Sequence, residues 1–98
     1  MQKGGYVYIM TNKRNGTLYT GVTNDLIRRV CEHKEGKISG FTKDNDIKTL
    51  VYYECWGDIR DAIKKEKIIK HWKREWRIKT IEESNSRWED LYPKIIGS

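Results

Sequence analysis

One carboxylate stands out because it lies among apolar residues of a predicted helix. The segment from Asp58 to about Lys73 has helical spacing, and its apolar stripe is formed by Ile59, Ala62, Ile63 and Ile69. Glu66 falls inside this stripe, three residues after Ile63 and three before Ile69. A carboxylate in such a place is poorly solvated unless it is paired or binds a metal ion. Glu66 is therefore the first candidate for chemistry, and a buried ion pair with an arginine is the structural alternative.

Two further candidates share one flank of an earlier predicted helix, Asp25 to about Glu35. Arg29 and His33 are four residues apart, so their side chains lie one above the other. The apolar stripe beside them is expected to consist of Leu26, Ile27, Val30 and Cys31. A structural account of the pair is also open: His33 is then a surface histidine, and Arg29 is a partner of Asp25 one turn earlier.

Two tyrosines are predicted to lie on one face of a two-stranded ribbon. The segments 6–11 and 17–21 both have strand character, and Asn15-Gly16 between them is a strong hairpin signal. Residues two apart in a strand share a face, so a hairpin loop with an even number of residues places Tyr8 and Tyr19 on the same side. From the strands alone, a pair of packed aromatic rings is the favoured explanation.

Positive charge is concentrated in one segment. The chain has a net charge of +6, and residues 64–79 alone supply it, with eight Lys or Arg against two Glu. Such a block indicates a polyanionic partner, most simply nucleic acid, although a solvated helix face is the alternative. The predicted phosphate contacts are Lys64, Lys67, Lys70, Lys73, Arg74 and Arg77. Phe41, in a glycine-bounded loop, is predicted to stack on a base, whereas Trp72 and Trp76 are expected in the core.

Several other classes of protein are poorly supported. Two cysteines are too few for a disulfide scaffold and indicate reduced, partly buried thiols. Cys31 and His33 diverge by about 200° on a helix, so they cannot easily hold one zinc ion. The chain has no phosphate-cradling glycine loop, no apolar run of roughly 20 residues and no signal peptide. We therefore expect a cytoplasmic protein that does not enter a membrane.

The elements that must position these residues form one predicted domain, residues 1–98, of the α+β class. A small three-stranded antiparallel sheet is expected to be flanked by helices. The strands are predicted at 6–11, 17–21 and 49–55, and the helices at 25–35, 58–73 and 75–83, with a last short helix opened by Ser86–Glu89 and ended near Pro93. Thr23 or Asn24 is expected to cap the first helix, the third strand is apolar enough to be central, and 36–48 is expected to be a polar loop.

These residues resemble a known family, the GIY-YIG nuclease superfamily, and above all its small standalone bacterial members. The resemblance rests on "YVY" (Tyr6–Tyr8), "YTG" (Tyr19–Gly21), Arg29, His33 and the later Glu66, and it covers nearly the whole chain. Tyr8 and Tyr19 are eleven residues apart, as the family's two motif tyrosines are, and Arg29 follows Gly21 at the family's interval. Gly21 is expected to let the chain turn so that Tyr19 and Arg29 face one site. The resemblance implies a three-stranded antiparallel sheet with flanking helices and a metal-dependent phosphodiesterase that acts on DNA.

The resemblance also implies a role for each residue. Glu66 would be the single protein ligand of one divalent ion, Mg²⁺ or Mn²⁺, which would stabilise the leaving 3′ oxygen. Arg29 would grip the scissile phosphate, and His33 would be an accessory acid, base or phosphate donor. Tyr19 would deprotonate the attacking water, with Tyr8 orienting it or sharing the task. Since lowering a phenol pKa from about 10 to 7 requires roughly 4 kcal/mol, a neutral tyrosine that relays a proton is an equally good interpretation.

The chain departs from the family pattern in two respects. Val7 and Thr20 replace the usual interior residues of the two motifs, and both replacements keep strand propensity. No second DNA-binding domain follows, so we expect the protein to recognise DNA weakly, by its structure, or with a protein partner that supplies specificity. Two hypotheses follow: a metal-dependent DNA endonuclease, possibly structure-selective in DNA repair or recombination, or a non-catalytic nucleic-acid-binding module that retains the nuclease fold.

Overall fold

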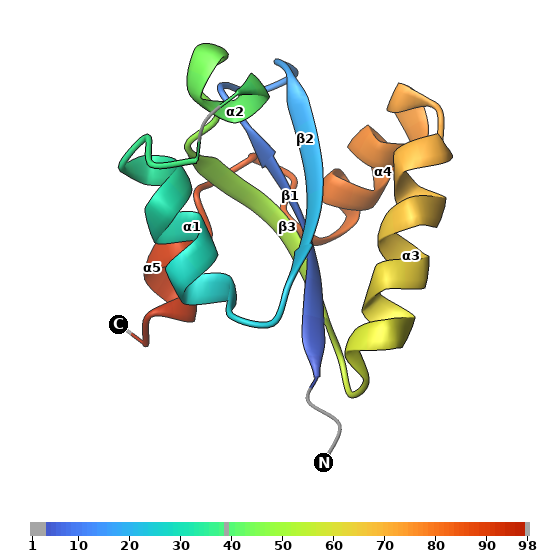
Figure 1. Cartoon of the computed structure of the whole chain (residues 1–98). Coiled ribbons are helices and arrows are strands. Elements are labelled where there is room, and N and C mark those ends of the chain that lie inside the picture. The colour runs from blue at the N-terminus through green and yellow to red at the C-terminus, as the bar shows by residue number, and fades with distance from the viewer. Residues whose placement is uncertain (1–3, 39, 98) are drawn as a thin grey trace.

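A three-stranded antiparallel sheet forms the centre of the protein, with helices on both of its faces (Figure 1). The computed structural model describes residues 4–38 and 40–97. Strands β1 (Gly5–Thr11), β2 (Leu18–Thr23) and β3 (Thr49–Trp56) lie in the order β2-β1-β3. This arrangement confirms the predicted α+β class and the small antiparallel sheet.

The prediction that the third strand is central is wrong, because β1 occupies that place. The outer edge of β3 is nevertheless covered by the C-terminal part of the chain. The Leu91 amide donates to the Leu50 carbonyl oxygen at 2.8 Å, and Asn85 Nδ2 donates to the Val51 carbonyl oxygen at 3.1 Å. Only the part of β3 that this segment covers is buried, at Leu50 and Val51, and this part accounts for the apolar composition.

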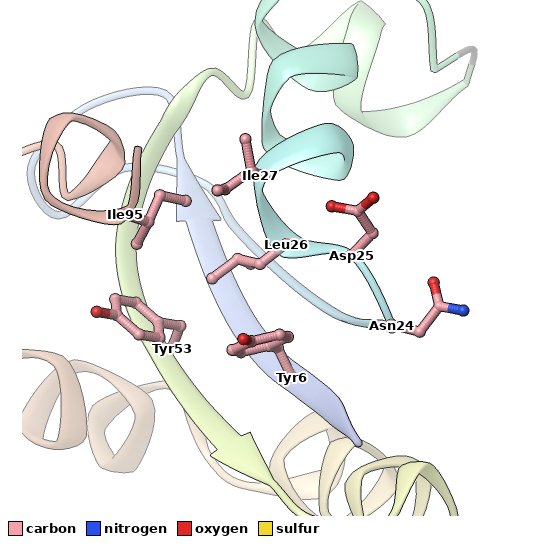
Figure 2. Close-up of a pocket in the computed structure, with 7 residues that line it drawn as sticks. All are labelled: Tyr6, Asn24, Asp25, Leu26, Ile27, Tyr53 and Ile95. Atoms are coloured by element: carbon pink, nitrogen blue, oxygen red, sulfur yellow. The ribbon is translucent and has the colours of Figure 1, made fainter. Parts of the chain in front are cut away.

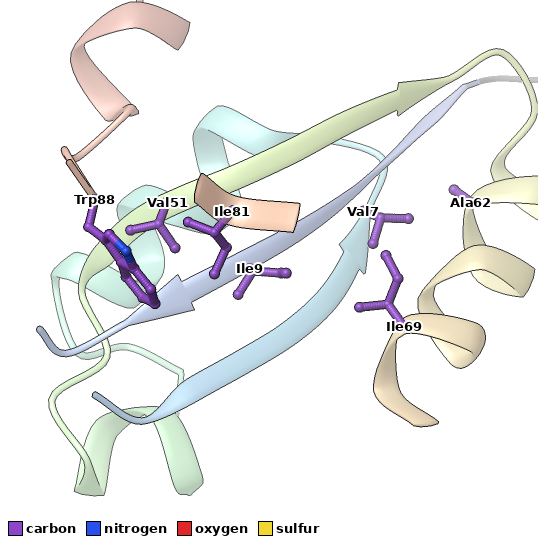
Figure 3. Close-up of a cluster of buried hydrophobic side chains, with 7 residues drawn as sticks. All are labelled: Val7, Ile9, Val51, Ala62, Ile69, Ile81 and Trp88. Carbon is purple, nitrogen blue, oxygen red and sulfur yellow. The ribbon is translucent and has the colours of Figure 1, made fainter. Parts of the chain in front are cut away.

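Two hydrophobic clusters fill the space between the sheet and its helices. Helices α1 (Leu26–Lys34) and α5 (Tyr92–Ile95) lie over one face, and α3 (Ile59–His71) and α4 (Arg74–Ser84) lie over the other (Figure 1). The cluster on the α1 side contains Tyr8, Met10, Leu26, Val30, Ile47 and Leu50. The cluster on the α3 side contains Val7, Ile9, Val51, Ala62, Ile69, Ile81 and Trp88 (Figure 3).

Helix α1 differs from the prediction at its start and on its buried face. Asp25 caps it by accepting a hydrogen bond from the Arg28 amide, so neither Thr23 nor Asn24 is the cap. Gly36 ends it as predicted, with φ of 69°. Its buried residues are Leu26, Val30 and His33, whereas Ile27 is 46% exposed. The helix is therefore rotated so that the histidine, and not Ile27, faces the sheet.

The second predicted helix is confirmed as α3, capped by Asp58, and a short extended break at Trp72–Lys73 separates it from α4. Its buried residues are Ala62, Glu66 and Ile69. The prediction that Trp72 and Trp76 are core residues is wrong for Trp76, which is 59% exposed. The half-buried Trp72 packs edge to face against it, with 6.4 Å between the ring centroids.

Three smaller predictions, about the 36–48 segment, the last helix and the cysteines, also need correction. The segment expected to be a polar loop contains a short helix, α2 (Phe41–Asp44), while Ser39 within it lies outside the described residues. Ser86–Glu89 does not open a helix; the last helix begins at Tyr92, and Pro93 lies in its first turn, where the missing amide is harmless. Both cysteines are free thiols, but Cys55 is exposed.

Candidate functional site

The two motif tyrosines lie on one face of the sheet, as the hairpin register predicts. Tyr8 is opposite Gly21, and Met10 is opposite Tyr19, so both tyrosine side chains point toward α1. Their ring centroids are 6.2 Å apart. A Cβ atom at Gly21 would lie 2.6 Å from the hydroxyl oxygen of Tyr8. Gly21 is thus required for the close approach of the Tyr8 ring within a strand, and the expected role in a chain turn is wrong.

His33 is buried beside both tyrosines. Only 2% of its surface is exposed, so it is not the surface histidine of the structural alternative. Its Nε2 lies 3.1 Å from the Tyr8 hydroxyl oxygen, and its ring centroid is 5.5 Å from that of Tyr19. Burial and then the charge of Arg29 lower the pKa of His33 to about 4. The histidine is therefore neutral at neutral pH.

Arg29 directs its charge toward the same group of rings. Its side chain is 35% exposed, and its Nε lies 3.5 Å from Glu32 Oε1 without the geometry of a hydrogen bond. Asp25 instead lies near Arg28, at 4.0 Å, so the expected Arg29–Asp25 pair does not form. Arg29 thus presents a partly buried guanidinium whose Nε has no hydrogen-bond partner.

The environment of Tyr8 favours a neutral phenol. Burial first, and then Tyr19, raises the pKa of Tyr8 well above its ordinary value, although Arg29 acts in the opposite direction. Tyr8 is fully buried, whereas Tyr19 is half-buried. Of the two phenols, Tyr19 is the one that a water molecule or a substrate can reach, and Tyr8 is placed to orient its neighbours.

Phe41, the first residue of α2, extends this group of rings to the surface. Its ring stacks on that of Tyr19 with 6.5 Å between centroids and 26° between planes, and 52% of the residue is exposed. We refer to Tyr8, Tyr19, Arg29, His33 and Phe41 together as the tyrosine cluster. The structure therefore brings five of the predicted residues together from β1, β2, α1 and α2.

Glu66 is buried on α3 as its place in the apolar stripe predicts, with 7% of the residue exposed. Its ion pair is with Lys70 one turn later and not with an arginine. Within the described ranges, no hydrogen bond or ion pair joins Glu66 to the tyrosine cluster. The two lie on opposite faces of the sheet, with the edge strand β2 running between α1 and α3 (Figure 1).

A buried hydroxyl on β2 was not singled out by sequence reasoning. Thr20, the interior residue of "YTG", is 3% exposed and points to the face that carries α3. Its Oγ1 has no hydrogen-bond partner. The sequence does show a polar residue where strand alternation predicts a buried one, and this was the available signal.

Few side chains of the described residues are placed to coordinate a metal ion. No group of three or more His, Cys, Asp or Glu side chains among residues 4–38 and 40–97 is arranged to hold an ion, which is unlike a structural zinc site. Glu66 supplies a single carboxylate. That donor fits Mg²⁺ or Mn²⁺, since such ions keep several waters and accept substrate phosphate oxygens as ligands.

The predicted phosphate contacts fall into two groups. Lys64, Lys67, Lys70 and Lys73 are exposed along α3 and at its end. Arg74 instead donates two hydrogen bonds to the β1–β2 hairpin, to the carbonyl oxygens of Asn15 at 2.7 Å and Gly16 at 2.6 Å. Arg77 is half-buried, and its Nε has no hydrogen-bond partner.

A pocket of about 290 Å³ lies near the start of α1, away from these residues (Figure 2). Tyr6, Tyr53, Leu26 and Ile95 line it, and Asn24 and Asp25 lie at its outer side. None of the predicted site residues contributes to it. The hollow is mainly apolar and is lined by no arginine, lysine or histidine that could hold a phosphate, so the tyrosine cluster remains the candidate site.

A family model, relatives of similar sequence and a solved structure all indicate the same family. Residues 4–79 match the model of the GIY-YIG catalytic domain. A UPF0213 protein of Bacillus pumilus is 34% identical over 83 residues, which cover 85% of each chain. A UPF0213 protein of Clostridium perfringens is 36% identical over 92 residues, which cover 94% of this chain and 97% of the relative. The solution NMR structure of a UPF0213 protein from Bacillus halodurans is 27% identical, with a TM-score of 0.55 over 90% of this chain and 93% of that one.

The scope of the family match agrees with the geometry. It includes the three strands and helices α1, α2 and α3, which together carry the tyrosine cluster and Glu66. No helix in the described part of the chain is long and apolar enough to cross a membrane. With the matching fold, motifs and relatives, the chain belongs to the GIY-YIG family of nuclease domains.

Proposed function

We propose that the protein is a divalent-metal-dependent endonuclease that hydrolyses phosphodiester bonds in DNA. The observation that carries this proposal is the guanidinium of Arg29, which is partly buried beside the Tyr8 phenol and the neutral imidazole of His33. Its Nε has no hydrogen-bond partner. A planar guanidinium matches the oxygens of a phosphate and strengthens its hydrogen bonds in a water-poor site.

The residues of the tyrosine cluster divide the work according to their exposure. Arg29 holds the scissile phosphate and offsets the negative charge that develops on it. Tyr19, the more accessible phenol, receives or relays the proton of the attacking water. Tyr8 stays protonated and, through its contact with His33 Nε2, fixes the position of both rings. His33 is neutral and so does not repel the Arg29 guanidinium.

Glu66 is the residue that would hold a divalent ion, and the ion would supply charge stabilisation for the leaving oxygen. Glu66 lies on α3, and this helix contacts β2 on the face of the sheet opposite the tyrosine cluster. Because β2 is an edge strand, a nucleic-acid backbone that lies along this edge can meet Arg29 from one face and Glu66 from the other. Lys70, which is half-exposed, pairs with this carboxylate, and a bound ion would take over the role of its charge beside Glu66.

The test is a cleavage assay on branched, flap, single-stranded and duplex DNA, with Mg²⁺, with Mn²⁺ and with chelator. Arg29→Ala and Glu66→Gln should each abolish cleavage, with circular dichroism showing that both variants remain folded. Arg28→Ala is the matched control, because Arg28 is the adjacent arginine but is 60% exposed and lies near Asp25. The proposal would be refuted if the wild-type protein cleaves none of these substrates in the presence of metal, or if both site variants keep full activity.

A second candidate is a nucleic-acid-binding module without catalysis. The ion pair between Glu66 and Lys70 favours it, since this pair gives the buried carboxylate a structural partner. In that case the exposed lysines of α3 bind phosphates, and neither Arg29→Ala nor Glu66→Gln changes salt-dependent binding. The same panel separates the two candidates, because only the endonuclease gives a product that disappears in both variants.

A further inference from the structure

A basic hollow lies at the tip of the β1–β2 hairpin, beside the first turns of α4. It has a volume of about 560 Å³, and Lys13, Asn15, Gly16, Thr17, Arg74 and Arg77 contribute to its wall. No residue of the tyrosine cluster lines it, and neither does Glu66. We call it the hairpin pocket. It is therefore distinct from the place where cleavage is proposed.

The hairpin side of this pocket is held in one conformation. The Gly16 amide donates to the Lys13 carbonyl oxygen at 2.9 Å, and the Thr17 amide donates to Asn12 Oδ1 at 3.0 Å. A side chain at Gly16 would collide with that same Asn12 oxygen. Arg74 ties the hairpin to α4 through its two hydrogen bonds to carbonyl oxygens. The wall of the pocket is thus formed before any ligand arrives, which reduces the entropic cost of binding.

The positive charges of the pocket are not neutralised by carboxylates of the described residues. Among the described residues, no carboxylate forms an ion pair with Lys13, Arg74 or Arg77. Burial and then the neighbouring Arg74 charge lower the pKa of Arg77, although an arginine stays protonated. Two guanidiniums that repel each other, one with a buried Nε lacking a partner, are stabilised by an anion placed between them.

We propose that the hairpin pocket is a second phosphate site, which holds a backbone phosphate of nucleic acid outside the scissile position. Arg77 contacts the phosphate, Lys13 attracts it from the rim, and Arg74 positions the hairpin against α4. A phosphate suits the site because its several oxygens can accept from the fork of a guanidinium and from a lysine at the same time. The identity of the occupant as nucleic acid rests on the proposed function, whereas the phosphate chemistry rests on the pocket alone.

The first test measures binding of labelled duplex and single-stranded oligonucleotides in chelator, where no cleavage occurs. Arg77→Ala and Lys13→Ala should each weaken binding to both about fivefold to tenfold and lower the salt slope by about 1. Arg87→Ala removes the same charge from an exposed residue outside the pocket and should change affinity less than twofold. Arg77→Gln, which keeps most of the side-chain volume, provides a second variant if Arg77→Ala is unfolded by circular dichroism.

The second test titrates ¹⁵N-labelled protein with inorganic phosphate against chloride at equal ionic strength. Saturable amide shifts at Gly16, Thr17 and Arg77, lost in Arg77→Ala, support the phosphate site. If these shifts occur but the pocket variants bind oligonucleotides like the wild type, the pocket binds free phosphate, and the proposal that it binds nucleic acid is refuted. Equal losses in Arg77→Ala and Arg87→Ala without saturable shifts would overturn the site itself.

The two proposals fail in different ways. Binding in chelator does not depend on catalysis, so a wild-type protein without nuclease activity but with an Arg77-dependent affinity would refute the endonuclease and keep the pocket. Conversely, an active enzyme whose Arg77→Ala variant binds and cleaves like the wild type at every salt concentration would refute the pocket and keep the endonuclease.

Discussion

A glycine in the middle of β2 allows the tyrosine cluster to form. Gly21 faces Tyr8 across the β1–β2 pair, and the phenol ring occupies the space that a side chain would need. The phenol in turn contacts His33, which is buried between the sheet and α1. The hydrogen bond between a strand and a helix therefore depends on a residue that has no side chain.

Gly21→Ala should displace the Tyr8 ring and weaken its contact with His33. The new Cβ would fall 2.6 Å from the Tyr8 side chain, and the ring has little room to shift because it is fully buried. We expect a loss of about 2 kcal/mol in the free energy of unfolding, measured in urea, and a strong decrease in any cleavage activity. Gly57→Ala is the control, because a Cβ there meets nothing within 4 Å. Equal stability of both variants would show that the Tyr8 ring moves freely.

The acid stability of the protein should report on His33. Its pKa is about 4 in the folded protein, against about 6.5 in an unfolded chain, so the unfolded state binds the extra proton first as pH falls. Stability is thus highest above pH 6.5 and declines toward pH 4, by about 2 to 3 kcal/mol in total. Urea unfolding between pH 4 and 7 measures this decline. His33→Gln should flatten the curve, and an unchanged slope in that variant would assign it to other groups.

The pairing of Tyr8 with Tyr19 and of Arg29 with His33 was predictable, whereas their packing and the contact of Phe41 with Tyr19 were not. Alternation along two strands placed Tyr8 and Tyr19 on one face, and the spacing of Arg29 and His33 placed them on one flank of a helix. The rotation of α1 was mispredicted because Ile27 and His33 compete for the buried face. Hydrophobicity alone favours Ile27, but the contact with Tyr8 makes His33 the buried residue.

At the level of helices and strands, several local signals were correct, although the cap expected at Thr23 or Asn24 and the capping box at Ser86–Glu89 were not. The hairpin at Asn15-Gly16, the cap at Asp58 and the stop at Gly36 were all confirmed. The strand order and the C-terminal segment were not, because they depend on contacts between distant parts of the chain. Asp90 shows this: it accepts from the Leu50 amide and pairs with Lys34, two residues far from it in sequence.

Asn85 is the residue that attaches this C-terminal segment to the sheet. It is 7% exposed; its Nδ2 donates to the carbonyl oxygens of Val51 and Glu89, and its Oδ1 accepts from the Glu89 amide. Asn85→Ala leaves these backbone groups unsatisfied, so we expect about 3 kcal/mol less stability in urea unfolding. Ser86→Ala, one residue later in the predicted capping box that does not form, should stay within about 0.5 kcal/mol. A similar loss in both would attribute the effect to the loop in general.

At the scale of the whole molecule, the two candidate groups lie on opposite faces of the sheet. The tyrosine cluster lies on the α1 side, and Glu66 lies on the α3 side. Each face also needs a hydrophobic core, because a chain of 98 residues buries little surface. A buried carboxylate among Ala62 and Ile69 weakens the core that holds the fold together. Such a cost is expected where function and stability compete for the same position.

Glu66→Leu tests this competition directly. Leucine completes the apolar stripe, and Lys70, which is half-exposed, remains solvated after its partner is removed. We expect the free energy of unfolding to rise by about 1 to 2 kcal/mol while metal-dependent cleavage disappears. Lys70→Ala should do the reverse for stability, since it leaves a buried carboxylate without a cation. If Glu66→Leu instead destabilises the protein as much as Lys70→Ala does, the pair is a structural one, and the non-catalytic binding module becomes the better account of the same residue.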